Sequence, residues 1–147
     1  MAYSDRELLA RLIQCEAGGE GDNGMRAVAS VVINRVRQSG GEYARISQGG
    51  NLRNIVFQRG QFDCVSETLG GRYNAQNIYN MRPEAIHYEI ADWALAGNKL
   101  YGVGNALWFY NPFSSACRTY FPSTVGVLTT KIVQHCFYDP TAEYYST

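Results

Sequence analysis

The sequence has no net charge, no long apolar run and no basic cluster, and each absence excludes a class of function. Its 13 lysines and arginines balance 13 aspartates and glutamates, so the formal net charge is zero. The sequence has no basic stripe that would indicate nucleic-acid binding. It also has no block of Lys or Arg that would indicate binding to an anionic membrane surface. No apolar run approaches the roughly 20 residues of a membrane-spanning helix. We therefore expect neither a nucleic-acid partner nor a membrane span.

The N-terminus also lacks the pattern of a secretory signal. Residues 1–6 lead directly into a helix start, without a charged segment followed by an apolar one. We therefore expect a chain that acts in the compartment that made it, or the mature form of a processed chain. The length of 147 residues, without repeats or linkers, predicts one domain spanning residues 1–147.

The sequence has four cysteines and no Cys-x-x-Cys pair: Cys15, Cys64, Cys117 and Cys136. This spacing supports neither a zinc site nor a redox motif. Without a signal, free and mostly buried thiols are the default expectation, and two disulfides are the alternative. A thiol nucleophile would need a histidine base, and the only two histidines lie far from Cys15 in sequence.

What the sequence does contain is a helix pattern that ends on a carboxylate. Ser4 is a good N-cap, and Glu7 three residues later completes the pattern of a capping box. Apolar residues then follow at helical spacing and form a stripe that would face the core: Leu9, Leu12 and Ile13. The next position on this stripe is Glu16.

Glu16 has the surroundings expected of a general acid. A carboxylate buried without a partner is destabilised, and its pKa rises until it keeps its proton. The small residues Ala17, Gly18 and Gly19 follow directly; they would end the helix and let another molecule approach closely. A neutral carboxyl beside open space can donate a proton to a substrate. The alternative is a structural glutamate, half in water or paired with an arginine.

Further along the chain, local patterns predict mostly helices. A second, buried helix is expected after Gly21, capped by Asp22-Asn23 and ending near residues 39–41. A short helix is expected over 51–57, and a turn into a short strand over 58–65. The polar pattern of 66–80 predicts a loop, and a loop of this length is typical of a functional rim or lid.

The last third of the chain predicts one more helix and two strands. The helix opens around Pro83 and stops at Gly97, with His87 and Glu89 on its outer or boundary face. The strand patterns cover residues 105–112 and 130–138. Three main helices with a few short antiparallel strands indicate a helix-dominated α+β fold.

Several segments resemble, in the right order, a known family. They are Cys-Glu-Ala-Gly-Gly-Glu-Gly at 15–21, the helix sequence at 24–36, Val-Phe-Gln-Arg-Gly-Gln-Phe at 56–62, Ala-Leu-Trp-Phe-Tyr-Asn-Pro at 106–112 and His-Cys-Phe-Tyr at 135–138. Together they resemble the spore cortex-lytic and cell wall hydrolase family of the SleB and CwlJ type, and more closely its single-domain CwlJ branch. The pattern departs at Asp63-Cys64, where a small polar residue and proline are expected. The resemblance implies a lysozyme- and transglycosylase-like fold and cleavage of peptidoglycan glycan strands in spore germination.

The family's catalytic glutamate maps onto Glu16, the residue that the helical stripe singles out. Glu20 also matches the motif; it would cap the following helix or position substrate. For the rest of the substrate groove we expect amide, hydroxyl and ring groups that bind sugars, and the candidates are Gln61, Phe62, Tyr110, Asn111 and His135. Phe62 is also a candidate for the core, together with Trp108 and Phe109.

One buried acid without an obvious partner favours a lytic transglycosylase. There the same glutamate protonates the glycosidic oxygen and then removes a proton from the muramyl 6-hydroxyl. A hydrolase acting on the muramyl or glucosaminyl bond would instead need a second carboxylate, for which Glu20 and Asp63 are the candidates. Two other classes stay open. One is a non-catalytic peptidoglycan-binding or coat module, and the other is an amidase or peptidase that uses Cys15 or Cys117.

The resemblance also bears on cofactors, partners and location. For the CwlJ branch it implies dependence on calcium and an accessory spore-coat protein. The sequence itself contains no recognisable calcium loop, so we expect no cofactor and no metal-binding residues. The expected partner is the glycan strand of peptidoglycan. The expected location is the spore coat and cortex region, or the bacterial cytoplasm before release.

Overall fold

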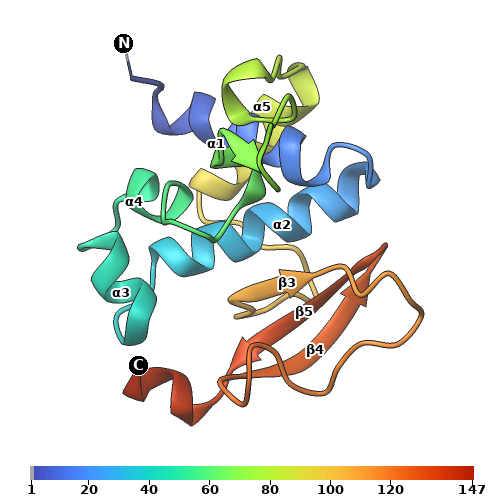
Figure 1. Cartoon of the computed structure of the whole chain (residues 1–147). Helices are drawn as coiled ribbons and strands as arrows, with labels where there is room; N and C mark the ends of the chain where they lie inside the picture. The colour runs from blue at the N-terminus through green and yellow to red at the C-terminus, as the bar shows by residue number, and fades with distance from the viewer. Residues whose placement is uncertain (1) are drawn as a thin grey trace.

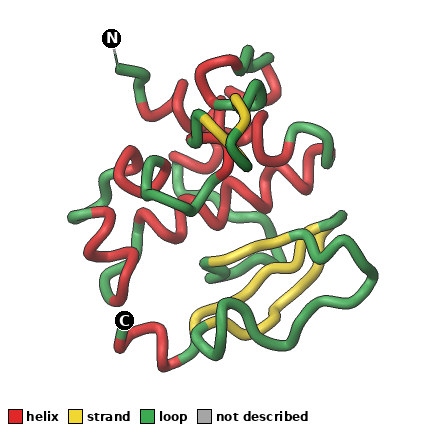
Figure 2. The backbone as a smooth tube through the Cα atoms, in the orientation of Figure 1, coloured by secondary structure: helices red, strands yellow, loops and turns green. Residues whose placement is uncertain are grey.

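The helices pack together on one side of the molecule, and a three-stranded sheet lies on the other (Figure 1). This is a computed structural model, and it describes residues 2–147. Figure 2 shows the same division, with the strands of the sheet gathered below the helices and a second, smaller ribbon among the helices in the upper part of the view. The prediction of a helix-dominated α+β fold with short antiparallel strands is confirmed.

Helix α1 (Asp5–Ala17) begins and ends where the sequence predicts. The Ser4 hydroxyl accepts a hydrogen bond from the Glu7 amide at 3.1 Å, as an N-cap should. The Glu7 side chain does not return to Ser4; its carboxylate accepts from Arg11 at 2.7 Å and from the Tyr88 hydroxyl at 2.7 Å. Only half of the predicted capping box therefore forms, because Glu7 has stronger partners elsewhere. Gly18 follows the helix as its C-cap.

Helix α2 (Gly21–Val36) is the central element and is buried over most of its length. The predicted cap at Asp22 is wrong: the N-cap position is occupied by Glu20, two residues earlier, and the helix begins at Gly21. Gly21 takes a positive φ of 76°, which lets the chain turn sharply into the helix. Asp22 lies inside the first turn, where its carboxylate accepts from Arg26 at 2.6 Å.

The remaining helices are short except for α5 (Ala85–Leu95). Helices α3 (Gly41–Ser47) and α4 (Leu52–Val56) follow α2, and α4 confirms the predicted short helix. Single 3₁₀ turns occur at η1 (Asp63–Val65), η2 (Ile78–Asn80) and η3 (Ala142–Ser146). The short strand predicted within 58–65 is therefore wrong. His87 on α5 is buried and does not lie on the outer or boundary face as predicted; its Nδ1 accepts a hydrogen bond from the Glu84 amide at 2.9 Å.

The sheet contains β3 (Trp108–Tyr110), β4 (Gly126–Ile132) and β5 (His135–Pro140) in the order β3-β5-β4, all antiparallel. The single strand predicted over 130–138 is split by a hairpin turn, in which Val133 has a φ of +54°. The predicted loop 66–80 carries the small ribbon of β1 (Thr68–Leu69) and β2 (Arg72–Tyr73). No helix within residues 2–147 is both long and apolar enough to span a membrane.

The cysteines form two disulfides, Cys15–Cys64 and Cys117–Cys136, so the default expectation of free thiols is wrong. Their Cα atoms lie 6.2 Å and 5.9 Å apart, within the range that a disulfide can bridge. Each bond joins segments that local patterns cannot bring together. The first ties α1 to η1, and the second ties the loop after β3 to β5.

Candidate active site

Glu16 lies in the last turn of α1, where the helix opens onto a hollow of about 690 Å³. The hollow is walled by the end of α1, by the turn that follows it and by the segment that leads into α5. The turn contributes Gly18 and Gly19, whose lack of side chains leaves room beside the carboxyl. The end of α1 therefore places the Glu16 carboxyl at the edge of this hollow.

The surroundings of Glu16 favour its neutral form. Burial raises the pKa of Glu16 to about 7, and the negative charges of Asp63 and Glu20 act in the same direction. The backbone of Cys64 and the Arg35 guanidinium oppose this rise. The Oε1 atom of Glu16 is buried and has no hydrogen-bond partner within residues 2–147. A carboxyl in this state holds a proton near neutral pH and can also release it.

The Cys15–Cys64 disulfide lies beside this acid in sequence and in space. Cys15 precedes Glu16 on α1, and Asp63 precedes Cys64 on η1. The bond therefore anchors η1 to the end of α1, which brings the Asp63 carboxylate close enough to influence the pKa of Glu16. Sequence reasoning missed this link, although Asp63-Cys64 is where the chain departs from the family pattern.

Arg35 is a buried cation whose charge reaches Glu16, yet the two side chains do not pair. The Arg35 Nε donates to the Leu107 carbonyl at 2.7 Å, and its guanidinium lies over the rings of Tyr43 at 4.8 Å and Phe62 at 5.2 Å. Within residues 2–147 no ion pair joins Glu16 to an arginine. Arg35 thus places a positive charge behind the acid without neutralising it.

Glu20 and His135 are brought together from opposite ends of the chain. The His135 Nδ1 lies 2.7 Å from the Glu20 carboxylate, and only 14% and 11% of their side chains are exposed. The edge of the Phe109 ring packs against the His135 ring, with centroids 5.2 Å apart. Glu20 occupies the N-cap position of α2, but its side chain makes no capping hydrogen bond. Its carboxylate therefore links the turn after α1 to β5 rather than capping the helix.

Phe62 lies in the core, and Gln61, which is half-buried, is held beside it. The Tyr43 hydroxyl donates to Gln61 Oε1 at 3.0 Å, which fixes that amide. Phe62 is buried and packs against Phe109 with ring centroids 6.5 Å apart. A ring buried on both sides offers no open face to a sugar, so Phe62 belongs to the core and not to a binding surface.

Tyr110 and Asn111 lie at the end of β3, and neither lines the hollow of Glu16. The Tyr110 ring stacks on Phe121, with centroids 4.6 Å apart. Asn111 donates to Gln134 Oε1 at 3.3 Å and lines a separate hollow of about 360 Å³ together with Phe113 and other residues. The structure therefore gathers Glu16, Glu20, Asp63 and His135, and leaves Asn111 at a different opening.

Two other kinds of chemistry find no support in the part of the chain that the structure describes. Within residues 2–147 no cluster of three or more His, Cys, Asp or Glu side chains is arranged to hold a metal ion. Cys15 and Cys117 are both in disulfides, so neither offers the thiolate that an amidase or peptidase would need.

Comparison with known proteins gives a consistent result. The profile of the cell wall hydrolase family matches residues 19–138. The cell wall hydrolase CwlJ of Oceanobacillus iheyensis is 32% identical over 139 residues, which cover 92% of this chain and 86% of that protein.

Two solved structures have a similar fold. The catalytic domain of the Bacillus cereus SleB protein gives a TM-score of 0.67 at 24% identity, covering 94% of this chain and 93% of that one. The catalytic domain of the germination-specific lytic transglycosylase SleB from Bacillus anthracis gives 0.63 at 24% identity, covering 94% and 98%.

Proposed function

This chain belongs to the cell wall hydrolase family, and on that premise we propose that it cleaves the glycan strands of peptidoglycan as a lytic transglycosylase. The observation that carries the proposal is the buried carboxyl of Glu16, whose pKa is raised to about 7 at the edge of an open hollow. The Bacillus anthracis relative of similar fold is a lytic transglycosylase specific to germination, which supports the reaction and its spore context.

In the proposed reaction Glu16 acts twice. Its protonated carboxyl donates the proton to the glycosidic oxygen while the bond from that oxygen to the muramyl C1 breaks, and the sugar gains oxocarbenium character. The resulting carboxylate then takes the proton of the muramyl 6-hydroxyl as that oxygen bonds to C1. An anhydro ring closes, and Glu16 regains its proton. A pKa near 7 suits both steps, since neither protonation state is strongly disfavoured near neutral pH.

The nearby charges have supporting roles in this scheme. Asp63 raises the pKa of Glu16, and its negative charge would stabilise the positive charge that develops on the sugar. Glu20 is held by His135 and fixes the turn that borders the hollow. Both proton transfers take place between Glu16 and the substrate.

The position of Asp63 also supports a second candidate, a hydrolase in which Asp63 activates a water molecule. The second carboxylate of an inverting enzyme must lie near the general acid, and Asp63 lies close enough to Glu16 for its charge to raise the pKa of that acid. The Asp63→Asn variant separates the two reactions. As a transglycosylase, the variant is slower but still releases anhydro-muramyl products, whereas a hydrolase releases reducing ends and loses about 10²- to 10⁴-fold in rate in this variant.

We further propose that the substrate is the peptidoglycan of the spore cortex and that the protein acts in the coat and cortex region during germination. An accessory coat protein as a partner is part of the same proposal. It rests on the similarity to CwlJ proteins, not on a surface of this chain.

The central test compares Glu16→Gln with Glu89→Gln, the same change at a carboxylate that is 66% exposed on α5. Each variant is incubated with purified cortex peptidoglycan, and the released fragments are identified by mass spectrometry. We expect anhydro-muramyl ends from the unchanged protein and from Glu89→Gln, and none from Glu16→Gln. Full activity of Glu16→Gln would overturn the proposal, as would wall binding without any cleavage by the unchanged protein.

A further inference from the structure

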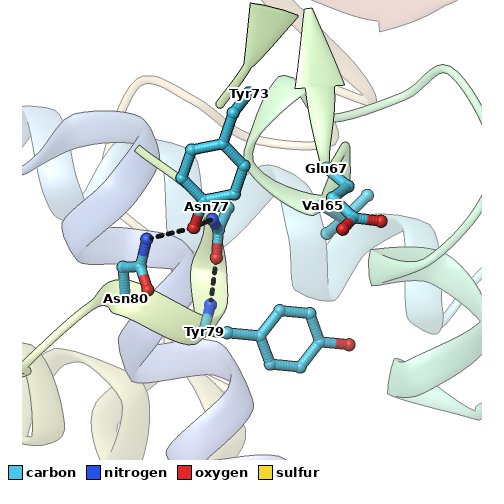
Figure 3. A pocket seen from close by; sticks show the side chains of 6 residues that line it. All are labelled: Val65, Glu67, Tyr73, Asn77, Tyr79 and Asn80. Carbon is cyan, nitrogen blue, oxygen red and sulfur yellow. Dashed lines mark hydrogen bonds between the residues drawn. The ribbon is translucent and has the colours of Figure 1, made fainter. Parts of the chain in front are cut away.

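A second hollow, of about 470 Å³, lies between the β1–β2 ribbon and η2 and has no role in the chemistry above. Figure 3 shows Asn77 between the rings of Tyr73 and Tyr79, with Glu67 and Val65 on the opposite side. Both tyrosines are more than half exposed, at 64% and 62%. Both rings are therefore accessible to a ligand, beside amide groups that could fix its orientation.

The polar groups of this hollow are fixed before any ligand arrives. The Tyr73 hydroxyl accepts hydrogen bonds from the Asn77 and Asn80 amides at 3.2 Å and 3.0 Å, so its own proton is left to donate outwards. Asn77 Oδ1 accepts from the Tyr79 amide at 2.9 Å. Arg11 of α1 donates to the backbone carbonyls of Ile78, Tyr79 and Met81 at 2.9–3.3 Å. The helix that carries Glu16 thus also holds this hollow in place.

The two hollows are neighbours. Asn80 lines both of them, and Gln76, which lines the hollow of Glu16, belongs to the segment between Tyr73 and Tyr79. An extended polymer bound across Glu16 would pass over Asn80 towards the tyrosine rings.

We propose that this hollow is a saccharide subsite that binds the glycan strand at a distance from the bond being cut, an inference that rests on the proposed function. Phenol rings stack against the apolar faces of sugars, and amides with a hydroxyl donor match sugar hydroxyls and acetamido groups. The carboxylate that lines the hollow, Glu67, would repel the acidic groups of a stem peptide but accepts hydrogen bonds from the uncharged N-acetylglucosamine units of the strand. The occupant is therefore the glycan and not the peptide.

The test measures binding without cleavage, in the Glu16→Gln background, by calorimetry with two probes: a single disaccharide of N-acetylglucosamine and N-acetylmuramic acid, and a long peptide-free glycan strand. Tyr79→Ala should weaken binding of the long strand about tenfold and leave the disaccharide unchanged, because one stacking contact is lost. Tyr79→Phe keeps the ring and should bind as before. The matched control is Tyr101→Ala, at a tyrosine that is 99% exposed elsewhere on the surface, and it should have no effect.

Two results would overturn the subsite: equal affinity of Tyr79→Ala and Tyr101→Ala for the long strand, or equal weakening of binding for the disaccharide and the strand. These results are independent of the proposed function. That function fails if the unchanged protein releases no anhydro-muramyl fragments, whatever the binding data show.

Discussion

Cys15 and Cys64 are joined by a disulfide that places Glu16 and Asp63 on neighbouring segments, one on α1 and the other on η1. The bond joins cysteines that are 49 positions apart in the sequence, and it lies directly beside the carboxyl of Glu16. It keeps a negative charge near Glu16, and that charge adds to the effect of burial on the pKa of this acid. The covalent link and the proposed chemistry are therefore coupled.

Removal of this disulfide should change both stability and the pH profile. The Cys15→Ser, Cys64→Ser double variant is expected to lose about 4 kcal/mol of unfolding free energy, since the unfolded chain is no longer constrained. With η1 released, the Asp63 charge moves away and the pKa of Glu16 falls towards its ordinary value. We expect the alkaline limb of the activity profile to move to lower pH. Denaturant unfolding and kcat/KM measured against pH check the two effects.

The control is the Cys117→Ser, Cys136→Ser double variant, which removes the disulfide of β5 and leaves η1 in place. It should lose about 3 kcal/mol for its shorter loop and keep the pH profile. If the pH profile of activity is unchanged in both double variants, the Cys15–Cys64 disulfide does not influence the pKa of Glu16.

The pKa of Glu16 predicts the pH dependence of the reaction directly. The acid must be protonated for the first step, so kcat/KM should fall about tenfold per pH unit above pH 7. Asp63→Asn removes a charge that disfavours the ionised form of Glu16, so its pKa should fall and the alkaline limb should move to lower pH. A limb that does not move in Asp63→Asn would show that burial alone sets the pKa.

Glu16 should also make the protein less stable as pH rises. Its pKa is about 7 in the folded state, against 4.5 for a glutamate side chain free in water. The contribution of Glu16 to the free energy of unfolding is therefore largest below pH 4.5. This contribution is lost as the pH rises through 7. The neutral Glu16→Gln variant escapes this loss and should be more stable at pH 8 by up to roughly 3 kcal/mol.

Urea unfolding at acidic pH and at pH 8 measures this difference, with Glu89→Gln as the control for an exposed carboxylate. If Glu16→Gln and the unchanged protein show the same pH dependence of stability, the carboxyl is solvated in solution and its role as a buried acid fails.

Glu20 and His135 should stabilise the fold cooperatively, and the interaction free energy between them can be measured. Both side chains are largely buried, so removing one leaves the other without its partner. We expect Glu20→Gln and His135→Ala each to lower the unfolding free energy, with a coupling of about 1–3 kcal/mol in a double-mutant cycle. Additive losses would mean that the two residues stabilise the fold independently.

Local sequence patterns predicted the parts of the site that depend on neighbours along the chain. The N-cap at Ser4, the apolar stripe of α1 and the glycines that end it were enough to place Glu16 at a helix terminus. The local sequence patterns gave wrong predictions where contacts in the folded chain override the preference of a short segment. His87 turns inwards to cap its own helix, and the strand pattern around Val133 breaks into a hairpin.

The sequence by itself determined the helix-dominated fold and the position of Glu16 at a helix end, because capping, helical periodicity and turn chemistry act over a few residues. The family was indicated separately, by the resemblance of several segments in the same order. Only the tertiary structure decided which cysteines pair, that His135 meets Glu20 across 115 positions, and that Phe62 lies in the core while Asn111 lines another opening. These outcomes depend on how separate helices and strands pack against one another. The spacing of residues along the chain does not determine the distances between such elements in the fold.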